Sequence, residues 1–557
     1  MGSVCLYSQS RNQVLESLPP RPLADVLVLQ YFATFETTHR LVHREQFIQE
    51  LEVFWADSDR ASDGWLAQLC MMLALGCHAS PAQCLAGSMR TAEEWTDLLL
   101  DAGQFFLGQA PFFASPTLTT VRTICLAVIA LMAETAKGVG KQLVFVMGFL
   151  VRLAMTMNLH RATSLVAGPE TSVSDFEAEM RNRVWVTIQL LDVDIATRTG
   201  TTTVVRLADH DADQPLNLSE SDFHQTGHGW VLDTRSHALS SDREERLTDS
   251  TFQIKLSEIV PALAEIVNSA NSVIQPPLLL ETVKTLDSRL RQKLQDAESV
   301  LLQRDASTAI SQVLAQKTIV QTQFLRVLVH RALLALHHRS FCAQLLKLSS
   351  RTQQQIPNSV LAAIQSAISL LQAQHDWSLP ALEQQQQAVP MTPLSSPWLL
   401  DLCHDDFGAA VLYLMVALAR LKNRDWDGYV TLQHDEQQQQ QQQSTFQQIP
   451  PRAAAWSVLR QSVQQHLRDG ACRSLVHFKE FVGRSIALGC LEALERNGQP
   501  HMMLQTALLA VSEQIEQTAL AGKQDVLWGT AEAGVAGSVQ AGLHTGNAPF
   551  VDFQFGH

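Results

Sequence analysis

Four carboxylates spaced like the ligands of a calcium-binding loop are the first residues whose types and spacing point to chemistry. Asp209, Asp211 and Asp213 alternate along the chain, and Glu220 falls at the twelfth position of the pattern. An EF-hand loop has oxygen ligands at these positions, but it also needs a glycine at the sixth position for its sharp turn. Gln214 stands at that position instead. We therefore expect a solvated acidic loop, with calcium binding as the alternative.

Three short motifs resemble parts of catalytic sites, and each lacks something that the chemistry needs. Residues 138–141 (Gly-Val-Gly-Lys) look like a phosphate-binding loop, but Gln142 replaces the Ser or Thr that holds magnesium. Residues 159–161 (Leu-His-Arg) are similar to a kinase catalytic loop, but Ala162 replaces its aspartate. Residues 483–487 resemble a nucleophile elbow, although the preceding segment is typical of a helix and not of a strand. We predict that the protein is not an enzyme and that it needs no cofactor.

The cysteines indicate a reducing compartment and no metal site. The chain has nine of them, scattered over its length and without a CxxC pair, which differs from a disulfide framework. Cys70, Cys77 and Cys84 recur every seven residues. This spacing favours buried positions on one helix face, since a zinc site uses a closer pair of ligands.

Neither a leader peptide nor a membrane-spanning helix is expected. Residues 1–18 lack a basic segment followed by an apolar run. The longest apolar stretches, 124–133 and 143–157, are shorter than the roughly 18 residues that a spanning helix needs. We predict no membrane association.

The composition indicates a large folded core and argues against direct contact with nucleic acid. Hydrophobic residues make up 46% of the 557 residues and charged residues only 17%. The 41 basic and 55 acidic residues give a formal net charge of −14. Because affinity for DNA rests on Lys and Arg that neutralise phosphates, such a chain is a poor unaided DNA binder.

Helical periodicity dominates the sequence from Pro22 onward, and the alternation typical of strands is rare. The fold class that we expect is all-α: a large multi-helix body of packed helical hairpins, with polar Gln-rich loops and a flexible C-terminal tail. Glutamine runs at 384–387 and 437–443 cannot bury apolar surface, and they are interpreted as solvent loops.

The best-specified helix begins near residue 175. Ser174 and Glu177 form a capping-box pattern at its start. Glu177 with Arg181, and Glu179 with Arg183, have the spacing of ion pairs, which we expect on the solvated side. The predicted apolar stripe consists of Phe176, Met180, Val184, Ile188 and Leu191.

A second long helix is predicted over about 278–304, followed by another near 308–347. Leu286, Leu290, Leu294, Ala297 and Leu301 give the first one an apolar stripe, which favours a packed helical hairpin over a coiled coil. The later helix carries a small basic cluster, interpreted as a solvated helix end, with anion or partner contact as the alternative. The cluster consists of Arg331, His337, His338 and Arg339.

Four segments, in this order, carry a family resemblance. They are residues 20–55, with PRPLADVL at 20–27, YF at 31–32, LVHREQF at 41–47 and FW at 54–55; residues 148–161 (GFLVRLAMTMNLHR); residues 176–187 (FEAEMRNRVWVT); and residues 213–218 (DQPLNL). Together they resemble the regulatory middle domain of fungal zinc-cluster transcription factors over about residues 20–225. Residues 255–259 extend the resemblance more weakly.

Eight residues are the candidates for regulatory or partner contact. Within the resembling segments, we expect Arg152, His160 and Arg161 to form a buried or half-buried polar network near the helix start at 174, and Trp185 to be an aromatic core anchor. For each residue, structural support is the first interpretation, and ligand or partner contact is the alternative. At the C-terminus an acidic-aromatic peptide is a hypothetical dock for a coactivator, with a frayed terminus as the alternative. The residues are Arg152, His160, Arg161, Arg181, Trp185, Phe550, Asp552 and Phe553.

The sequence departs from the family pattern at the DNA-reading module. Zinc-cluster factors carry six cysteines in a compact basic segment, whereas Cys5 stands alone before residue 70. Three explanations stay open: the protein works through a DNA-binding partner, an upstream coding exon is missing from the sequence, or the middle domain was recruited to another role.

The expected organisation has five parts: a polar lead (1–20), a helical regulatory domain (21–430), a Gln-rich loop (431–452), C-terminal helices packed on the body (453–521) and a flexible tail (522–557).

The resemblance implies a fungal transcription regulator of biosynthetic or catabolic pathway genes, with DNA contact supplied by a partner or by a missing zinc cluster. The alternatives are a helical scaffold or sequestering protein without DNA contact, and an enzyme of unrecognised class. Transcription factors, coactivators, a second copy of the chain and a small-molecule effector are the expected partners, with DNA bound only indirectly. The expected location is the nucleus, with shuttling to the cytoplasm as a variant.

Overall fold

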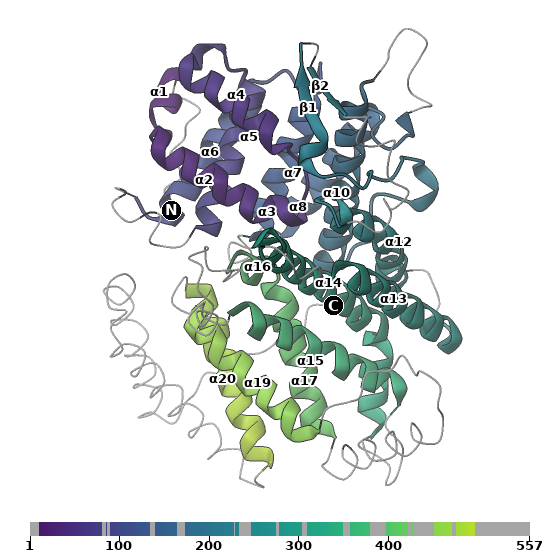
Figure 1. Ribbon diagram of the computed structural model, residues 1–557. Coiled ribbons are helices and arrows are strands. Elements are labelled where there is room, and N and C mark those ends of the chain that lie inside the picture. The colour runs from purple at the N-terminus through teal and green to yellow at the C-terminus, as the bar shows by residue number, and fades with distance from the viewer. Residues whose placement is uncertain are drawn as a thin grey trace. The chain divides into compact units, whose positions relative to one another are not determined.

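A computed structural model of the chain shows a protein built from packed α-helices (Figure 1), which confirms the predicted all-α fold class. The described part forms two compact units, residues 1–459 and residues 460–557. The structure describes residues 10–80, 85, 88, 90–133, 140–163, 173–227, 229–232, 247–273, 278–302, 309–348, 357–378, 397–421, 426, 451–469 and 475–495.

The first unit begins with helices that pack mainly on their neighbours in the chain. Their bounds are α1 (Arg11–Glu16), α2 (Arg21–Ala33), α3 (Phe35–Thr38), α4 (Arg44–Ala56), α5 (Asp63–Ala79), α6 (Ala92–Gln109), α7 (Leu118–Ala133) and α8 (Gly140–Thr156), with a short 3-10 turn, η2 (Ser58–Arg60). Helix α5 is almost entirely buried because it packs against α2, α6 and α7 together. Ser62 caps its start by accepting a hydrogen bond from the backbone N–H of Trp65 at 3.3 Å.

The helix predicted from residue 175 is α10 (Asp175–Thr199), and it packs against α7, α8 and α12. Ser174 accepts the backbone N–H of Glu177 at 3.2 Å, which confirms this half of the predicted capping box, while the Glu177 side chain lies 3.7 Å from Arg181. The helix ends at Gly200, whose φ of 67° is the left-handed conformation that glycine adopts readily. Buried residues lie on all faces of α10, so it is a core helix and not an amphipathic surface helix.

A small antiparallel hairpin is the one β-structure among the described residues. Strands β1 (Phe223–Thr226) and β2 (Gly229–Leu232) pair with Phe223 opposite Leu232. It follows the 3-10 turns η5 (Leu207–Asp209) and η6 (Glu220–Asp222). Phe223 packs with Phe176, Met180 and Leu218, which attaches the hairpin to the start of α10.

The remaining helices of the first unit are α12 (Thr251–Asn271), α13 (Leu280–Leu301), α14 (Ala309–Leu348), α15 (Asn358–Ser378), α16 (Pro397–Leu402) and α17 (His404–Arg420). The apolar stripe predicted for α13 is confirmed, since all five of its residues are buried. Helix α13 packs against α12 and α14, which is the helical hairpin arrangement that its short stripe indicated.

Helix α14 contains the one described stretch that is long and apolar enough to cross a membrane by length and composition alone. The stretch is Lys317–Gln344, and 78% of its most apolar window is buried inside the structure. It packs against α12, α13 and α15. These contacts are those of a core helix.

The basic cluster of α14 differs from its sequence interpretation as a solvated helix end. Arg331 and His337 are buried, whereas His338 and Arg339 are exposed. Arg331 pairs with Asp194 and Asp406, and His337 Nε2 lies 2.8 Å from Asp287 Oδ2. The interpretation was wrong for Arg331 and His337 because the packing of neighbouring helices on α14 buries them against carboxylates that are distant in sequence.

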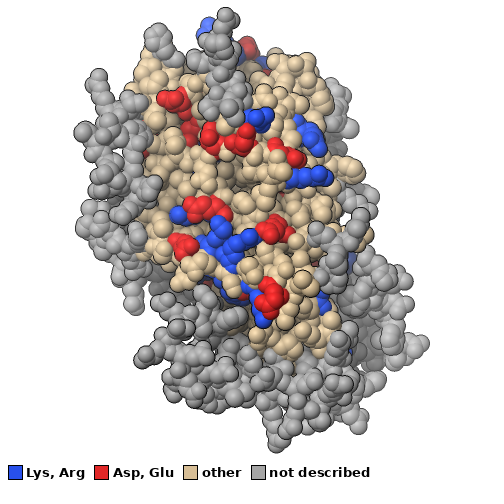
Figure 2. Space-filling view, turned by 90° about the vertical axis from the view of Figure 1, so that its right-hand side faces the viewer, with Lys and Arg blue, Asp and Glu red and all other residues tan. Residues whose placement is uncertain are grey.

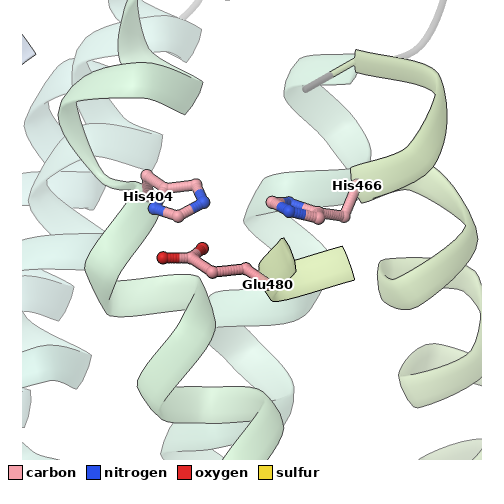
Figure 3. A group of neighbouring side chains, drawn as sticks. All are labelled: His404, His466 and Glu480. Carbon is pink, nitrogen blue, oxygen red and sulfur yellow. The ribbon is translucent and has the colours of Figure 1, made fainter. Parts of the chain in front are cut away.

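The second unit contributes the end of α19 (Arg452–Asp469) and α20 (Leu475–Glu495) to the described residues. Residues 483–485 lie inside α20, so the nucleophile-elbow interpretation is excluded. Figure 3 shows the side chains of His466 and Glu480, which come from the two helices. Arg484 Nη2 donates to Glu480 Oε2 at 3.2 Å, and its Nη1 lies 3.5 Å from His466 Nδ1. His404, also drawn in Figure 3, belongs to the first unit.

Several predicted features lie outside the described residues. They are the glutamine runs at 384–387 and 437–443, residues 138 and 139 of the loop at 138–141, and the tail residues Phe550, Asp552 and Phe553.

Candidate regulatory site: a buried ionic cluster

The segment between α3 and α4 is fixed by one buried carboxylate. Glu36 Oε1 accepts the backbone N–H groups of Leu41 and Val42 at 2.9 and 3.0 Å. Its Oε2 accepts the hydroxyl of Tyr31 at 2.6 Å. These bonds shape the turn that presents Arg40 and His43 to the interior, where both are buried.

His43 combines a capping role with a buried position. Its Nδ1 accepts the backbone N–H of Gln46 at 3.2 Å, so the imidazole replaces the usual Ser or Asp at the start of α4. Its Nε2 points the other way and lies 3.2 Å from Glu220 Oε2. The His-Arg turn recognised in the sequence is therefore the link between α4 and the loop before β1.

Glu220 is the meeting point of three basic side chains. Arg40 pairs with Glu220 Oε1, and Arg183 Nη1 donates to the same oxygen at 3.1 Å. Arg183 Nε donates to Glu179 Oε1 at 2.8 Å, while Glu179 Oε2 accepts the backbone N–H of Leu216 at 2.9 Å. We call Arg40, His43, Glu179, Arg183 and Glu220 the ionic cluster.

The pair Glu179–Arg183 corrects the sequence prediction. Its spacing along α10 was as expected, but the two side chains are each only 1% exposed, not solvated. The predicted position was wrong because α10 is covered on all sides, by the loop at 213–222 and by α12 among others. The pair Glu177–Arg181 fits the prediction better, with a separation of 3.7 Å and Glu177 half exposed.

The charges of the ionic cluster are mutually stabilised. Burial opposes ionisation of Glu220, but attraction to Arg40 and Arg183 outweighs it and lowers the pKa of this carboxyl. Burial also opposes the charge of Arg183, yet Glu179 and Glu220 raise the pKa of its guanidinium. Burial lowers the pKa of His43 and so favours the neutral imidazole, although the negative charge of Glu220 acts in the opposite direction. The cluster thus holds two cations, two anions and a neutral histidine.

Aromatic rings exclude water from one side of the ionic cluster. The His43 ring lies 4.7 Å from Trp230, 5.2 Å from Phe176 and 5.6 Å from Phe223, measured between ring centroids. The Arg183 guanidinium lies 5.5 Å from the Phe223 ring centroid, a cation–π distance. The hairpin β1–β2 therefore acts as the cover of the cluster.

A second layer of contacts attaches α12 and α14 to the ionic cluster. The backbone N–H of Glu220 donates to Asp249 Oδ2 at 3.1 Å, and Lys317 Nζ donates to Asp249 Oδ1 at 2.8 Å. Gln253 Nε2 donates to the backbone carbonyl of Arg183 at 2.8 Å. Segments from residue 36 to residue 317 thus meet at one place.

The acidic loop does not assemble a calcium site. Asp211 Oδ1 accepts Arg161 Nε at 2.8 Å and the backbone N–H of Ala162 at 3.0 Å, and Asp213 Oδ2 accepts the backbone N–H of Thr163 at 3.3 Å. Glu220, the twelfth position of the pattern, is taken by arginines instead. The expectation of a solvated loop holds for Asp211, whose side chain is 45% exposed, but not for Glu220.

The candidate residues near residue 160 form a separate group. His160 is half-buried, and its ring centroid lies 6.1 Å from that of Trp185. Trp185 is 2% exposed and also meets the ring of His210 at 5.8 Å. Arg161 and Arg152 are exposed; Arg161 pairs with Asp211, and Arg152 Nη1 lies 3.7 Å from Met155 Sδ. Arg181 binds the backbone carbonyl of Met157.

Sequence reasoning missed the residues that carry the central charges. Arg40 lies just before the recognised LVHREQF motif, and Glu220 was noticed only as a calcium ligand. The signal available was the buried character of the flanking segments, which leaves charged residues there in need of partners. A second buried group, Asp194 with Arg198, Arg331 and Asp406, was missed for the same reason.

The arrangement suits a conformational role better than a chemical one. Every member of the ionic cluster is held by opposite charges or backbone groups, and none of the five is a hydroxyl or thiol nucleophile. On the face shown in Figure 2, basic and acidic side chains lie side by side, so the described part of this face is neither uniformly positive nor uniformly negative. Exposed or half-exposed ion pairs among the described residues include Arg289 with Glu265, and Arg326 Nε with Glu298 Oε1 at 2.5 Å.

Comparison with known proteins identifies the class. Residues 28–325, which contain the whole ionic cluster, match the model of the fungal specific transcription factor domain, and the chain belongs to this family. The resemblance predicted from the four segments is thereby confirmed.

Among the relatives are transcription factors of several fungi. The chain is 24% identical over 383 residues to the equisetin cluster transcription factor eqxF of Fusarium heterosporum, covering 67% of this chain and 51% of the relative. It is 28% identical over 289 residues to transcription factor opdR of Penicillium oxalicum, covering 52% and 34%. It is 24% identical over 376 residues to the Zn(2)-C6 fungal-type transcription factor pigI of Monascus ruber, covering 66% and 42%. The match thus spans about half or less of these relatives' own length, and no solved structure matches the chain.

Proposed function

We propose that this protein regulates transcription in a fungus and controls the genes of a biosynthetic pathway. The observation that carries the proposal is the match of residues 28–325 to the fungal specific transcription factor domain. Relatives that bear the names of equisetin, fusarisetin A and pyrrolocin clusters support control of a pathway gene cluster. The names of these relatives as transcription factors also support a protein without enzyme activity.

In this proposal the helical domain sets the active or inactive state, and DNA contact comes from a partner protein or from a zinc cluster outside this sequence. The net charge of −14 supports this division, because an acidic chain is repelled by phosphates. The mixed charges on the face shown in Figure 2 support it as well. The protein would act in the nucleus.

In this proposal, the partner protein binds the candidate residues whose side chains are exposed. Arg152 and Arg161 present their side chains to solvent, whereas Trp185 is buried and Arg181 nearly so. A transcription factor, a coactivator or a second copy of the chain is the proposed partner. Charge reversal at both exposed arginines would then weaken co-precipitation of that partner without changing the far-UV circular dichroism of the chain.

The test is the transcriptome of a strain that lacks the gene. We expect coordinated loss or gain of transcripts from one group of neighbouring genes. Fusing the chain to a heterologous DNA-binding domain should change expression of a reporter that carries the matching sites. Unchanged transcripts and an unresponsive reporter would contradict the proposal and favour a scaffold or sequestering role.

A further inference from the structure

Arg122 is a buried cation that lacks a partner in the described structure. It lies on α7 and is 8% exposed, next to Val121 and within one turn of Ile124 and Cys125, which are also buried. Among the described residues, none gives its guanidinium a hydrogen bond or ion pair, and Nε is fully covered without an acceptor. The other buried arginines already discussed, such as Arg183 and Arg331, are paired with carboxylates.

The two carboxylates that attract Arg122 already accept hydrogen bonds from other groups. Glu36 and Glu50 both act on it electrostatically. Both oxygens of Glu36 accept bonds from Tyr31 and the backbone, as described above. Glu50 Oε2 accepts the indole N–H of Trp65 at 2.8 Å, and Oε1 accepts the amide of Gln46 at 3.0 Å. Within the described structure, neither carboxylate forms a hydrogen bond or ion pair with Arg122.

The guanidinium stays charged in this position. Burial lowers the pKa of Arg122 to about 10, against the opposing attraction of Glu36 and Glu50. At neutral pH the side chain is therefore a buried cation without a hydrogen-bonded counter-ion among the described residues. A buried charge of this kind requires a counter-charge, which water cannot supply.

A second unpartnered polar group lies on the facing helix. Gln68 of α5 is 2% exposed, and its Oε1 is covered without a hydrogen-bond partner in the part of the chain that the structure describes. Helices α5 and α7 pack together, and Gln68 lies one turn after Trp65, whose indole binds Glu50. Two polar side chains on neighbouring core helices thus lack the partners that buried groups normally have.

We propose that Arg122 binds the carboxylate of a small organic acid that enters the interior of the domain beside α5 and α7, with the amide of Gln68 turned so that its Nε2–H donates to the same carboxylate. The planar guanidinium matches a carboxylate through two parallel hydrogen bonds. A single negative charge balances Arg122, whereas a phosphate dianion would add repulsion from Glu36 and Glu50. The apolar surfaces of α5 and α7 suit an acid with a hydrocarbon body. Such a ligand would stabilise the closed packing of these helices and so act as an effector.

The test uses the purified full-length chain in a chloride-free buffer. Acetate, butyrate, hexanoate and benzoate are added in turn, with inorganic phosphate as the comparison, and the melting temperature and calorimetric binding are recorded. We expect at least one carboxylate to raise the melting temperature, and phosphate to have no effect. Absence of any response to the four carboxylates, or a response to phosphate alone, would overturn the proposal.

Three variants separate binding from folding. Arg122→Met should abolish the response, and Arg122→Lys, which keeps the charge but loses the planar fork, should weaken binding about tenfold. Arg152→Met is the matched control at an exposed arginine and should respond like the natural protein. Without ligand, Arg122→Met should melt no lower than the natural protein, because no ion pair is lost. The proposal would be contradicted if a carboxylate raised the melting temperatures of Arg122→Met and Arg152→Met equally. It would also be contradicted if Arg122→Met without ligand were much less stable than the natural protein. These measurements stand apart from the reporter assay, so the binding proposal and the regulatory proposal can fail separately.

Discussion

Arg183 Nη1 donates to Glu220 Oε1 at 3.1 Å, and this bond joins the middle of α10 to a loop residue 37 positions later. Arg40 approaches the same carboxylate from the N-terminal helices. The bond therefore belongs to a junction of three segments that are distant in sequence. Because its charges are buried, removing one member leaves the others without compensation.

Glu220→Gln should destabilise the first unit strongly. The substitution keeps the size of the side chain but leaves Arg40 and Arg183, which are 5% and 1% exposed, facing a neutral group. Breaking a buried pair in this way costs about 3 kcal/mol. Urea denaturation followed by circular dichroism would measure the loss.

Glu52→Gln is the control for this prediction. Glu52 pairs with Arg21 at 2.7 Å, but the two side chains are 59% and 48% exposed. A solvated pair contributes little to stability, so the denaturation midpoint should stay close to that of the natural protein. Equal midpoints for the two variants would show that the ionic cluster does not hold the unit together.

Glu36 should make the protein less stable as the pH rises. Burial raises the pKa of Glu36 from 4.5 to about 7, against the attraction of Arg40 and the bond from Tyr31. The folded state therefore holds the proton more tightly than the unfolded state. The stability that this proton contributes is complete below pH 4.5 and is lost as the pH rises through about 7.

Glu36→Gln should remove most of this dependence. The amide keeps an acceptor for the turn but does not ionise, so between pH 5 and pH 8 the variant should lose less stability than the natural protein, by on the order of 3 kcal/mol. Urea denaturation at several pH values checks this. Asp192, whose pKa burial raises to about 6, leaves some slope in both proteins. Parallel stability curves would contradict the assignment.

Local features of the sequence predicted the helices well. The cap at Ser174 and the apolar stripe of Leu286 to Leu301 depend on residues within a few turns, and the structure confirms both. The small hairpin β1–β2 was not predicted, because it has only four residues in each strand and its stability comes from packing on Phe176. Short elements of this kind carry too little periodicity to be recognised.

The ionic cluster could not be predicted from local pattern. Whether Glu179 and Arg183 face solvent depends on the loop that covers them, and that loop is fixed by Glu220 and Leu216. Arg331 likewise pairs with Asp194, which lies 137 residues earlier in the chain. Spacing along a helix predicts which charges can pair, but tertiary packing decides whether the pair is buried.

Trp185 should act through packing alone. The residue is 2% exposed, and its indole Nε1 is covered without a hydrogen-bond partner among the described residues. Trp185→Phe should therefore cost only about 1–2 kcal/mol, and Trp185→Ala about 4 kcal/mol, in free energy of unfolding. Both values would come from denaturation curves of the purified chain.

Trp95 provides the comparison for Trp185. It is 7% exposed, and its Nε1 donates to Ser88 Oγ at 2.7 Å. Trp95→Phe loses this bond as well as packing, which adds about 1 kcal/mol. A larger loss for Trp185→Phe than for Trp95→Phe would indicate that the Trp185 indole has a hydrogen-bond partner in solution.

Gly76→Ala should disrupt the crossing of α2 and α5. A Cβ atom at residue 76 would lie 2.2 Å from the backbone oxygen of Leu27 and 2.8 Å from its carbonyl carbon. Backbone cannot move aside as a flexible side chain can, so the two helices must separate and lose the buried contacts between them. We expect a loss of more than about 3 kcal/mol in free energy of unfolding, measured by urea denaturation.

Gly148→Ala tests the same substitution where there is room for it. Gly148 lies inside α8, and a Cβ there would meet nothing within 4 Å. Alanine is the better helix former, so this variant should be more stable than the natural protein by roughly 0.5–1 kcal/mol. Opposite signs for the two variants would establish that the backbone contact with Leu27, and not the helical position of the glycine, is what excludes a side chain at residue 76. A Gly76→Ala protein as stable as the Gly148→Ala protein would mean that α2 and α5 do not pack this closely.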